Sequence, residues 1–206
     1  MSKKAVIVSG GELDEKLTLE ILKRQDTGCV IAVDRGLKFL YFHKIVPDYI
    51  VGDFDSVSPE IVDYYRVQKN VPVRAHNPVK DASDTELAIR HAMTLGSKEL
   101  LILGATGGRL DHLWANIQSL MIPFKAGIDA KIIDRQNLVR IVGGGETRLK
   151  KSEAYGQYFS VFPIGNEIFG FSISGAKYPL KNPKMTSDNS LCVSNEIAGD
   201  EIESVS

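Results

Sequence analysis

The sequence predicts an α/β N-terminal domain, in which helices flank a parallel sheet, followed by a small C-terminal antiparallel β domain, a sandwich or partial barrel. Over the first two-thirds of the chain, short apolar runs alternate with helical patterns, which is typical of a parallel sheet. The alternation ends near Gly143, Gly144 and Gly145, and short strands separated by Gly, Pro and Asn dominate beyond them. We therefore expect two domains, at residues 1–142 and 143–206.

The expected strands of the first domain are short apolar runs, as buried parallel strands are. They lie at residues 5–9, 29–33, 49–51, 71–73, 100–103 and 130–133. Apolar residues at helical spacing predict helices over residues 13–22, 35–42, 59–65, 83–95 and 113–121. The helix at 83–95 has the clearest start, because Ser83 and Glu86 match a capping box. Trp114 lies on the apolar face of the last helix, which favours a place in the core.

In the second domain, four short apolar runs predict the strands of the antiparallel sheet. They cover residues 147–149, 158–162, 169–173 and 191–193.

Composition excludes several classes of protein. Hydrophobic residues make up 43% of the 206 and charged residues 25%, as in ordinary globular proteins. The formal charge of −1 provides no basic field, so we expect no nucleic-acid partner. Cys29 and Cys192 lack the spacing of a zinc site and are expected to be free thiols, although a disulfide stays open. No apolar run approaches the roughly 20 residues of a membrane span, and none resembles a signal peptide, so we expect a cytoplasmic protein that does not bind membranes.

Polar residues follow the expected strands where each strand ends. Asp34, Asp53 with Asp55, and the segment from Gly104 onward all have this position. Ligands of open α/β sheets bind in the crevice outside the carboxyl ends of the strands. The sequence therefore predicts a ligand site at this edge of the sheet.

The segment Gly52-Asp53-Phe54-Asp55 carries two carboxylates in alternation. Alternate residues of a strand share a face, so we expect Asp53 and Asp55 to have backbones roughly 6–7 Å apart and side chains that can converge. At an effective dielectric constant of about 20, their charges repel by about 2–3 kcal/mol. A divalent cation would reverse that cost, and carboxylate oxygens suit Mg²⁺. Glycine and aspartate are also common in turns, so a simple turn is the alternative.

Asp81 and Asp84 flank the start of the helix that Ser83 caps. Each gains about 0.3–1 kcal/mol from the helix dipole, so helix capping alone would explain them. Because Ser83 already caps the helix, we favour the interpretation that one or both aspartates complete a metal site.

A glycine-rich turn spans residues 104–112 between a strand and a helix. Gly104, Gly107 and Gly108 let the backbone approach a phosphate closely, and amides at a helix start attract anions. Arg109 adds a forked donor, and Asp111 and His112 follow at once. The turn lacks the Gly-Lys-Ser/Thr ending of a P-loop. The glycines alone are weak evidence for a phosphate-binding loop, and the charged residues that follow them make the evidence stronger. His112 is also compatible with a structural role.

Two further positions stay open between function and structure. Asp34 is placed to bind a ribose hydroxyl or a base edge, or to cap the following helix. Small polar residues at 187–196 are compatible with β-turns or with hydrogen bonds to an organic ligand, and turns are favoured.

Five segments in this order resemble the thiamine pyrophosphokinase family, and together they span nearly the whole chain. They are Ala-Val-Asp-Arg-Gly at 32–36, Pro-Asp-Tyr-Ile-Val-Gly-Asp-Phe-Asp-Ser at 47–56, Lys-Asp-Ala-Ser-Asp-Thr-Glu at 80–86, Gly-Ala-Thr-Gly-Gly-Arg-Leu-Asp-His at 104–112, and Ser-Asn-Glu at 194–196. Arg35 departs from the glycine frequent there, and the β domain has no Trp, so aromatic stacking would fall to a residue such as Tyr178.

The resemblance implies a thiamine diphosphokinase, a transferase that moves the diphosphate of ATP to the hydroxyl of thiamine and yields thiamine diphosphate and AMP. It implies Mg²⁺ as cofactor, an ATP-binding catalytic domain at 1–142, and a β domain at 143–206 that contributes to thiamine binding and to a homodimer. In that dimer, thiamine would lie between the α/β domain of one subunit and the β domain of the other.

The resemblance also implies roles for individual residues. The metal ligands would be Asp53, Asp55 and Asp84, and the catalytic residues would be these three with Asp81, Arg109 and Asp111. ATP would contact Asp34, Gly104, Gly107, Gly108, Arg109, Asp111 and His112, and thiamine would contact Ser190, Ser194 and Asn195. A Mg²⁺-dependent phosphohydrolase and a non-catalytic nucleotide- or thiamine-binding protein are the alternatives.

Overall fold

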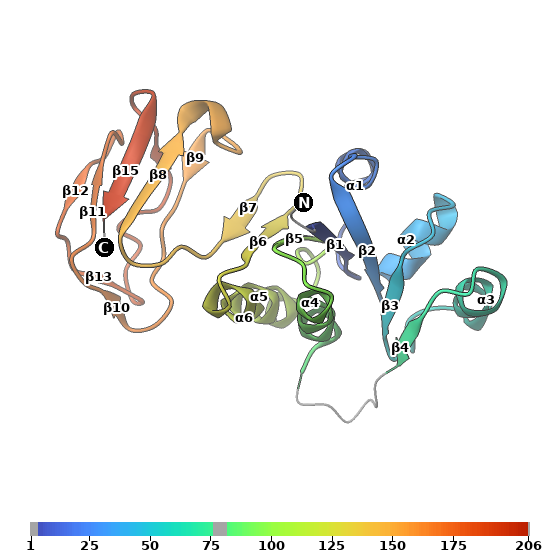
Figure 1. Cartoon of the computed structure of the whole chain (residues 1–206). Coiled ribbons are helices and arrows are strands. Elements are labelled where there is room, and N and C mark those ends of the chain that lie inside the picture. The colour runs from blue at the N-terminus through green and yellow to red at the C-terminus, as the bar shows by residue number, and fades with distance from the viewer. Residues whose placement is uncertain (1–3, 76–81, 206) are drawn as a thin grey trace. The chain divides into compact units, whose positions relative to one another are not determined.

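A computed structural model describes residues 4–75 and 82–205. The chain forms two compact units, unit 1 up to Ile141 and unit 2 from Val142 onward (Figure 1). The boundary expected from the glycine run lay one residue later, between 142 and 143. Of the helices in the described ranges, none is long and apolar enough to cross a lipid bilayer.

Within the described residues, unit 1 contains one seven-stranded sheet with the order β4-β3-β2-β1-β5-β6-β7. Its strands are β1 (Lys4–Val8), β2 (Thr27–Val33), β3 (Tyr49–Gly52), β4 (Val73–Ala75), β5 (Glu99–Leu103), β6 (Asp129–Ile133) and β7 (Leu138–Arg140). Neighbouring strands from β4 to β6 are parallel, and β7 pairs antiparallel with β6. All five residues of β1 are buried, as expected for the central strand of a sheet covered on both faces.

The helices of unit 1 cover both faces of this sheet (Figure 1). They are α1 (Glu15–Leu22), α2 (Gly36–Phe42), α3 (Pro59–Asp63), the π-helix η1 (Tyr64–Gln68), α4 (Asp84–Thr94), α5 (Leu110–Ser119) and α6 (Met121–Lys125). One apolar core joins β1 residues such as Val6 to α1, α2 and α3, for example through Leu40. A second core joins the opposite face, which carries Ile7, to α4 through Ile89 and to α5 through Ile117.

The order of the strands creates a switch point at β1. The chain moves outward from β1 through β2, β3 and β4, and then returns to place β5 on the other side of β1. The connections that follow β1 and β5 therefore diverge at the carboxyl edge of the sheet. In open α/β sheets such a divergence forms the ligand crevice.

Unit 2 is a set of short antiparallel strands. They are β8 (Glu146–Lys150), β9 (Tyr158–Phe159), β10 (Glu167–Ile168), β11 (Ser172–Ser174), β12 (Leu180–Lys181), β13 (Met185–Thr186), β14 (Asn195–Glu196) and β15 (Glu201–Val205), with a 3-10 turn η2 (Lys151–Glu153). Through residue 205, β12-β11-β15-β8 form one sheet, while β10 pairs with β13 and β9 with β14. Phe171, Ile173, Met185 and Cys192 are buried in a core of its own.

The structure confirms the predicted fold class, with a mostly parallel sheet flanked by helices and a separate antiparallel β region. Several details of the prediction were wrong. Leu191 and Cys192 form a turn and Val193 a bend rather than a strand, because the amide of Val193 donates to the nearby carbonyl oxygen of Ser190 at 3.2 Å. The expected strand at 158–162 ends at Phe159, and the one at 169–173 begins only at Ser172.

Helix α5 differs from the prediction in two ways. It ends at Ser119, and α6 follows as a separate helix after Leu120. Trp114 is 63% exposed rather than buried, and Leu110, one turn earlier, is 79% exposed. The apolar stripe read from the sequence therefore includes one face that unit 1 does not cover.

Candidate active site

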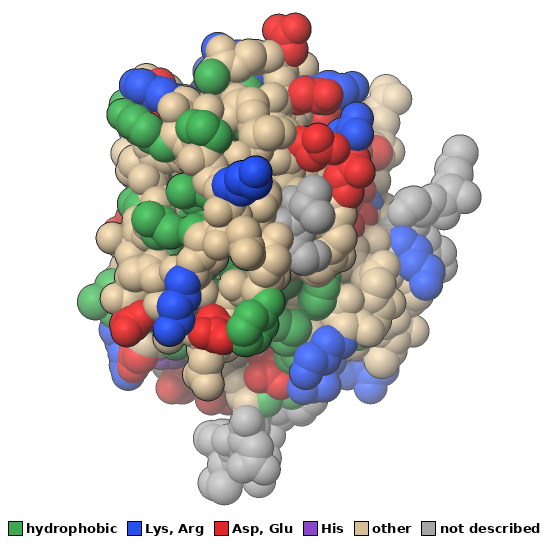
Figure 2. Space-filling model, turned by 90° about the vertical axis from the view of Figure 1, so that its left-hand side faces the viewer, with side chains coloured by type: hydrophobic (Ala, Val, Ile, Leu, Met, Phe, Trp, Pro, Cys, Tyr) green, Lys and Arg blue, Asp and Glu red, His purple; other side chains and the backbone are tan. Residues whose placement is uncertain are grey.

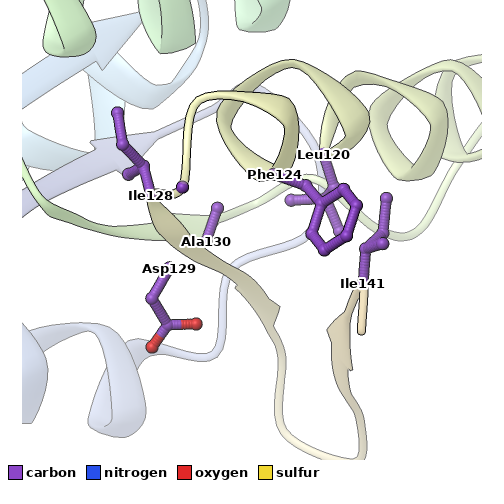
Figure 3. Close-up of a pocket in the computed structure, with 7 residues that line it drawn as sticks. Leu120, Phe124, Ile128, Asp129, Ala130 and Ile141 are labelled. Carbon is purple, nitrogen blue, oxygen red and sulfur yellow. The ribbon is translucent and has the colours of Figure 1, made fainter. Parts of the chain in front are cut away.

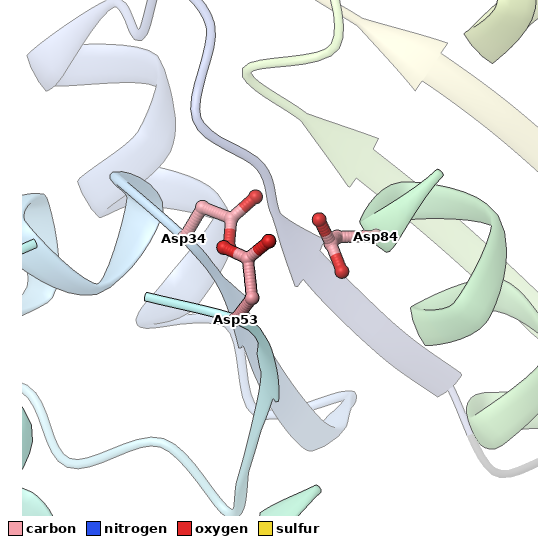
Figure 4. A group of neighbouring side chains, drawn as sticks. All are labelled: Asp34, Asp53 and Asp84. Carbon is pink, nitrogen blue, oxygen red and sulfur yellow. The ribbon is translucent and has the colours of Figure 1, made fainter. Parts of the chain in front are cut away.

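Three carboxylates meet at the carboxyl edge of the unit 1 sheet. Asp34 follows β2, Asp53 follows β3 and Asp84 is the first residue of α4. One oxygen of each lies within 4.8 Å of those of the other two. Figure 4 shows the three side chains converging on one point from separate elements. A group of oxygen ligands from separate stretches of the chain is what a hard divalent cation requires.

The register between β2 and β3 places Asp34. Val33 pairs with Val51, so the next residues, Asp34 and Gly52, lie beside each other. Asp34 has a φ of 43°, in the left-handed region that aspartate tolerates better than most residues. Its side chain makes no hydrogen bond that caps α2, because the N-cap position belongs to Arg35. The capping alternative for Asp34 is therefore wrong.

Asp84 is positioned by the start of α4. Ser83 is the N-cap residue, and its hydroxyl accepts a hydrogen bond from the amide of Glu86 at 3.3 Å. The capping interaction read from the sequence is thus present at this helix. It fixes the first turn, from which the Asp84 carboxylate points toward the other two (Figure 4).

Burial and the charges of the cluster both act on the Asp34 carboxyl. Burial is the larger cause, and together with the negative charges of Asp84, Asp53 and Asp55 it raises the pKa of this carboxyl to about 7. Its Oδ1 atom is buried and has no hydrogen-bond partner among the described residues. A buried, unpartnered carboxylate oxygen beside two further carboxylates fits a divalent cation, whose charge would offset the repulsion.

Asp55 lies outside this group of three. Strand β3 ends at Gly52, and Phe54 adopts a left-handed φ of 64°, so the strand alternation assumed for Asp53 and Asp55 does not continue. Asp55 is exposed, and its amide donates to Oδ1 of Asp53 at 3.3 Å. Its charge still contributes to the raised pKa of Asp34. Asp81, the fourth aspartate expected at the site, lies outside the described residues.

The glycine-rich turn follows β5 at the same edge of the sheet. Gly104, Gly107 and Gly108 have φ values of 65°, 78° and 69°, which favour glycine. A β-carbon on Gly104 would lie 2.4 Å from the carbonyl oxygen of Ser9, so only glycine fits there. Gly104 therefore packs against the end of β1, whereas Gly107 and Gly108 are exposed, as residues of an anion-binding loop must be.

Backbone hydrogen bonds join this turn to the segment after β1. The amide of Ser9 donates to Leu103 at 2.8 Å, that of Gly11 to Gly104 at 2.7 Å, and that of Glu12 to Thr106 at 3.0 Å. These bonds continue the β1–β5 pairing beyond the ends of both strands. The two loops at the switch point therefore form one connected surface.

Arg109 and Asp111 form a bidentate ion pair at the start of α5. Nε of Arg109 lies 3.1 Å from Oδ1 of Asp111, and Nη2 lies 2.6 Å from Oδ2. The Arg109 guanidinium lowers the pKa of Asp111. Both side chains are exposed, and the amide of His112 also donates to Asp111. The pair holds the guanidinium beside the first turn of α5.

Comparison with known proteins decides the family. The family described as "Thiamin pyrophosphokinase, catalytic domain" matches residues 22–132, and that described as "Thiamin pyrophosphokinase, vitamin B1 binding domain" matches residues 146–206. The chain belongs to the thiamine pyrophosphokinase family. The first match lies within unit 1 and the second within unit 2.

Individual members of the thiamine pyrophosphokinase family agree with this. A thiamine pyrophosphokinase of Bacillus subtilis is 35% identical over 168 residues, which are 81% of this chain and 77% of that protein. The crystal structure of a thiamine pyrophosphokinase from the same species superimposes with a TM-score of 0.86 at 31% identity, over 98% of this chain and 94% of the other. A structure from Geobacillus thermodenitrificans gives 0.82 at 30% identity, over 98% and 92%.

The residues expected to face thiamine all lie in unit 2, the unit that matches the vitamin B1 binding domain. Ser190 and Ser194 are exposed, and Ser194 has a left-handed φ of 56°. Asn195 is buried, and its side-chain amide bonds the backbone N–H and C=O of Tyr178 at 3.0 and 2.7 Å. Asn195 thus holds the Tyr178 segment in place, while the Tyr178 ring is exposed.

Sequence reasoning missed three polar residues near the site. Ser9 is buried at the end of β1, and Asn116 of α5 donates to the carbonyl oxygen of Ala105 in the glycine turn at 2.8 Å. Asp134 follows β6, and although burial alone would raise its pKa, hydrogen bonds from Asn137, the backbone and Thr106 lower it. Each had a signal, namely a polar residue at a strand end or on an apolar helix face.

A cavity of about 230 Å³ in unit 1 is unrelated to this site (Figure 3). It is lined mainly by apolar side chains, including Leu120, Phe124 and Ile141, and by the first residues of β6. Because β6 begins there, the cavity lies at the amino edge of the sheet. The carboxylates lie at the opposite edge, so the cavity takes no part in the chemistry described here.

Proposed function

We propose that this chain is a thiamine diphosphokinase, which transfers the diphosphate of ATP to thiamine and releases AMP. The observation that carries the proposal is the convergence of Asp34, Asp53 and Asp84 beside a glycine-rich turn at the switch point of an α/β sheet. In a member of this family, that arrangement supplies a place for a cation and a place for phosphates.

The reaction displaces AMP at the β-phosphorus of ATP. The hydroxyl oxygen of thiamine forms a bond to that phosphorus, and the bridging bond from the β-phosphorus to AMP breaks. AMP leaves with the electron pair, and the hydroxyl proton passes to a base or to water. Such transfers depend mainly on alignment and on neutralisation of charge.

Unit 1 supports this chemistry with its acidic cluster. Asp34, Asp53 and Asp84 would hold Mg²⁺, with Asp55 adding charge from the rim of the cluster. Mg²⁺ bound there would neutralise the negative charge of phosphate oxygens and orient them. The carboxylates would in turn fix the cation relative to the sheet, since they come from three separate elements.

The anionic part of ATP would lie along the glycine turn. Backbone amides of Gly104, Gly107 and Gly108 and the guanidinium of Arg109 would bind phosphate oxygens. Asp111 keeps that guanidinium beside α5 through two hydrogen bonds. His112, exposed in the same turn, is a further phosphate contact in this proposal.

Unit 2 would bind thiamine through exposed groups, with Ser190 and Ser194 as hydrogen-bonding partners and Tyr178 as a stacking surface. We also propose a homodimer, as first expected from the family resemblance. Unit 2 supports the homodimer with large exposed apolar side chains. In Figure 2 the left-hand side of Figure 1 faces the viewer, and hydrophobic side chains, coloured green, lie on that surface. The large exposed apolar side chains of unit 2 include Tyr155, Tyr158, Phe162, Ile164, Phe169, Tyr178, Leu191 and Val193. A cytoplasmic location stays a prediction.

The test is product analysis of the purified chain incubated with ATP and Mg²⁺, with and without thiamine. We expect AMP and thiamine diphosphate in equal amounts, and only when thiamine is present. Product formed from ATP without thiamine would indicate a phosphohydrolase, and binding of both ligands without AMP would indicate a non-catalytic protein. Light scattering during size-exclusion chromatography tests the dimer separately.

A further inference from the structure

A pair of buried hydroxyls connects the two halves of the proposed site. Oγ of Ser9 and Oγ1 of Thr85 lie 3.0 Å apart, although 76 residues separate them in the chain. Ser9 is 2% exposed and Thr85 8%. Ser9 directly follows β1, and Thr85 directly follows Asp84 in the first turn of α4.

Ser9 is held on the side of the glycine turn by its backbone. Its amide donates to the carbonyl oxygen of Leu103 at 2.8 Å, and its own carbonyl oxygen lies 2.4 Å from the position that a β-carbon on Gly104 would take. Val8 pairs with Leu103 in the sheet, so Ser9 and Gly104 are neighbours by register. The position of Ser9 is therefore fixed to that of the glycine turn.

Thr85 is held on the side of the carboxylates. It belongs to the same capped turn as Asp84, and the Ser83 cap gives that turn a defined backbone. A side-chain bond from the sheet to Thr85 is thus a direct restraint on where Asp84 lies.

We infer that Ser9 and Thr85 are positioning residues, whose hydrogen bond fixes the Asp84 carboxylate relative to the glycine turn. This inference rests on the proposed function, in which Asp84 binds the cation and the turn binds phosphate. A metal ligand and a phosphate loop must keep a constant separation if one substrate spans both. The bond joins the two elements that carry them.

Stability alone does not account for the pair. Two apolar groups of the same shape would fill the space at nearly the same free energy of unfolding, since a typical internal hydrogen bond contributes about 1 kcal/mol net. What such a replacement removes is the directional contact between β1 and α4. The expected defect is therefore in metal binding rather than in folding.

The experiment compares Ser9→Ala, Thr85→Val and the double variant with the wild type. Mn²⁺ titration without substrates, followed by the paramagnetic resonance of free Mn²⁺, gives the dissociation constant, and thermal unfolding gives Tm. We expect the dissociation constant to rise about 10-fold, as for residues that orient metal ligands. The double variant should bind no more weakly than either single variant, with a Tm close to the wild type.

Two further variants separate positioning from packing. Thr85→Ser keeps the hydroxyl and should retain wild-type Mn²⁺ affinity. Ser119→Ala removes a buried hydroxyl that, among the described residues, donates within α5 to the Ala115 carbonyl at 2.8 Å. This change should also leave the Mn²⁺ affinity unchanged. Equal Mn²⁺ affinity in all variants, or Thr85→Ser as weak as Thr85→Val, would overturn the inference. Failure of the wild type to make AMP would instead count against the proposed function.

Discussion

Oδ1 of Asp34 occupies the space that a β-carbon on Gly52 would need, since such a carbon would lie 2.1 Å away. Gly52 also has a φ of 143°, which L side chains rarely adopt. We predict that Gly52→Ala destabilises the protein by about 2–3 kcal/mol through backbone strain. It should also raise the Mg²⁺ concentration needed for half-maximal activity, because Asp34 must move.

The matched control is Gly96→Ala. Gly96 has a φ of 79°, but no heavy atom lies within 4 Å of the position that a β-carbon would take there. It should lower stability through strain alone and leave the Mg²⁺ requirement unchanged. The same Mg²⁺ requirement in both variants would contradict the role given to Gly52.

Asp53 and Asp55 should differ when each is changed to asparagine. Asp53 lies in the group of three converging carboxylates, whereas Asp55 is exposed beside it. We predict that Asp53→Asn lowers kcat by at least about 100-fold, the scale of one lost contact to developing charge, with the fold retained by circular dichroism. Asp55→Asn should lower kcat by only about 10-fold. Full activity of Asp53→Asn would remove the cation from the proposal.

The raised pKa of Asp34 predicts how the stability of the metal-free protein changes with pH. Its folded pKa of about 7 exceeds the ordinary value of 3.8, so the folded state binds a proton more tightly than the unfolded state. The contribution of Asp34 to the free energy of unfolding is fully present below its ordinary pKa of 3.8 and is lost as the pH rises through about 7. In EDTA, the Tm of Asp34→Asn minus the Tm of the wild type should therefore increase as the pH rises from about 4 to about 7. A Tm difference that stays constant or shrinks over this range would contradict the prediction.

Arg109 is the side chain expected to bind transferring phosphate. Arg109→Ala should lower kcat by at least about 10-fold, a conservative share of what one such donor contributes. Arg66→Ala is the control. Arg66 is also exposed and forms an ion pair, with Asp63 at 2.8 Å, but it belongs to η1 and not to the glycine-rich turn. Steady-state AMP formation measures both, and equal rates for the two variants would exclude Arg109 from the site.

Asn195 and Ser194 should separate structure from binding in unit 2. Asn195→Ala removes two hydrogen bonds between the buried Asn195 side chain and the backbone of Tyr178, which should cost about 2 kcal/mol of unfolding free energy in urea at about 1 kcal/mol for each bond. Ser194→Ala removes an exposed hydroxyl and should raise KM for thiamine with little loss of stability. An unchanged KM in Ser194→Ala would exclude this hydroxyl from thiamine binding.

The sequence predicts unit 1 well because its signals are strong and local. Apolar runs such as β1 and β5, and the Ser83 cap of α4, mark elements that the structure contains. Unit 2 is predicted less well, because strands of two or three residues, such as β9 and β14, are too short for periodicity to define. Trp114 was misplaced because an apolar stripe does not tell which part of it the fold covers.

The candidate site shows the same division. Residues at strand ends were marked as candidates from the sequence, and the structure brings two of them, Asp34 and Asp53, together with Asp84. The grouping of Asp34 with Asp53 depends on the pairing of Val33 with Val51, which is a long-range fact that no local pattern contains. Asp55 lies outside the group of three carboxylates because the left-handed backbone of Phe54 interrupts the strand alternation.

The central position of β1 affects how the chain can be made. In the finished sheet β1 lies between β2 and β5, and all five of its residues are buried. During synthesis, β2, β3 and β4 emerge before β5, so β1 remains an open sheet edge for much of translation. Apolar open edges recruit other chains. Fragments that stop short of Glu99 should therefore aggregate or be retained by chaperones, whereas chains that include β5 close that edge themselves.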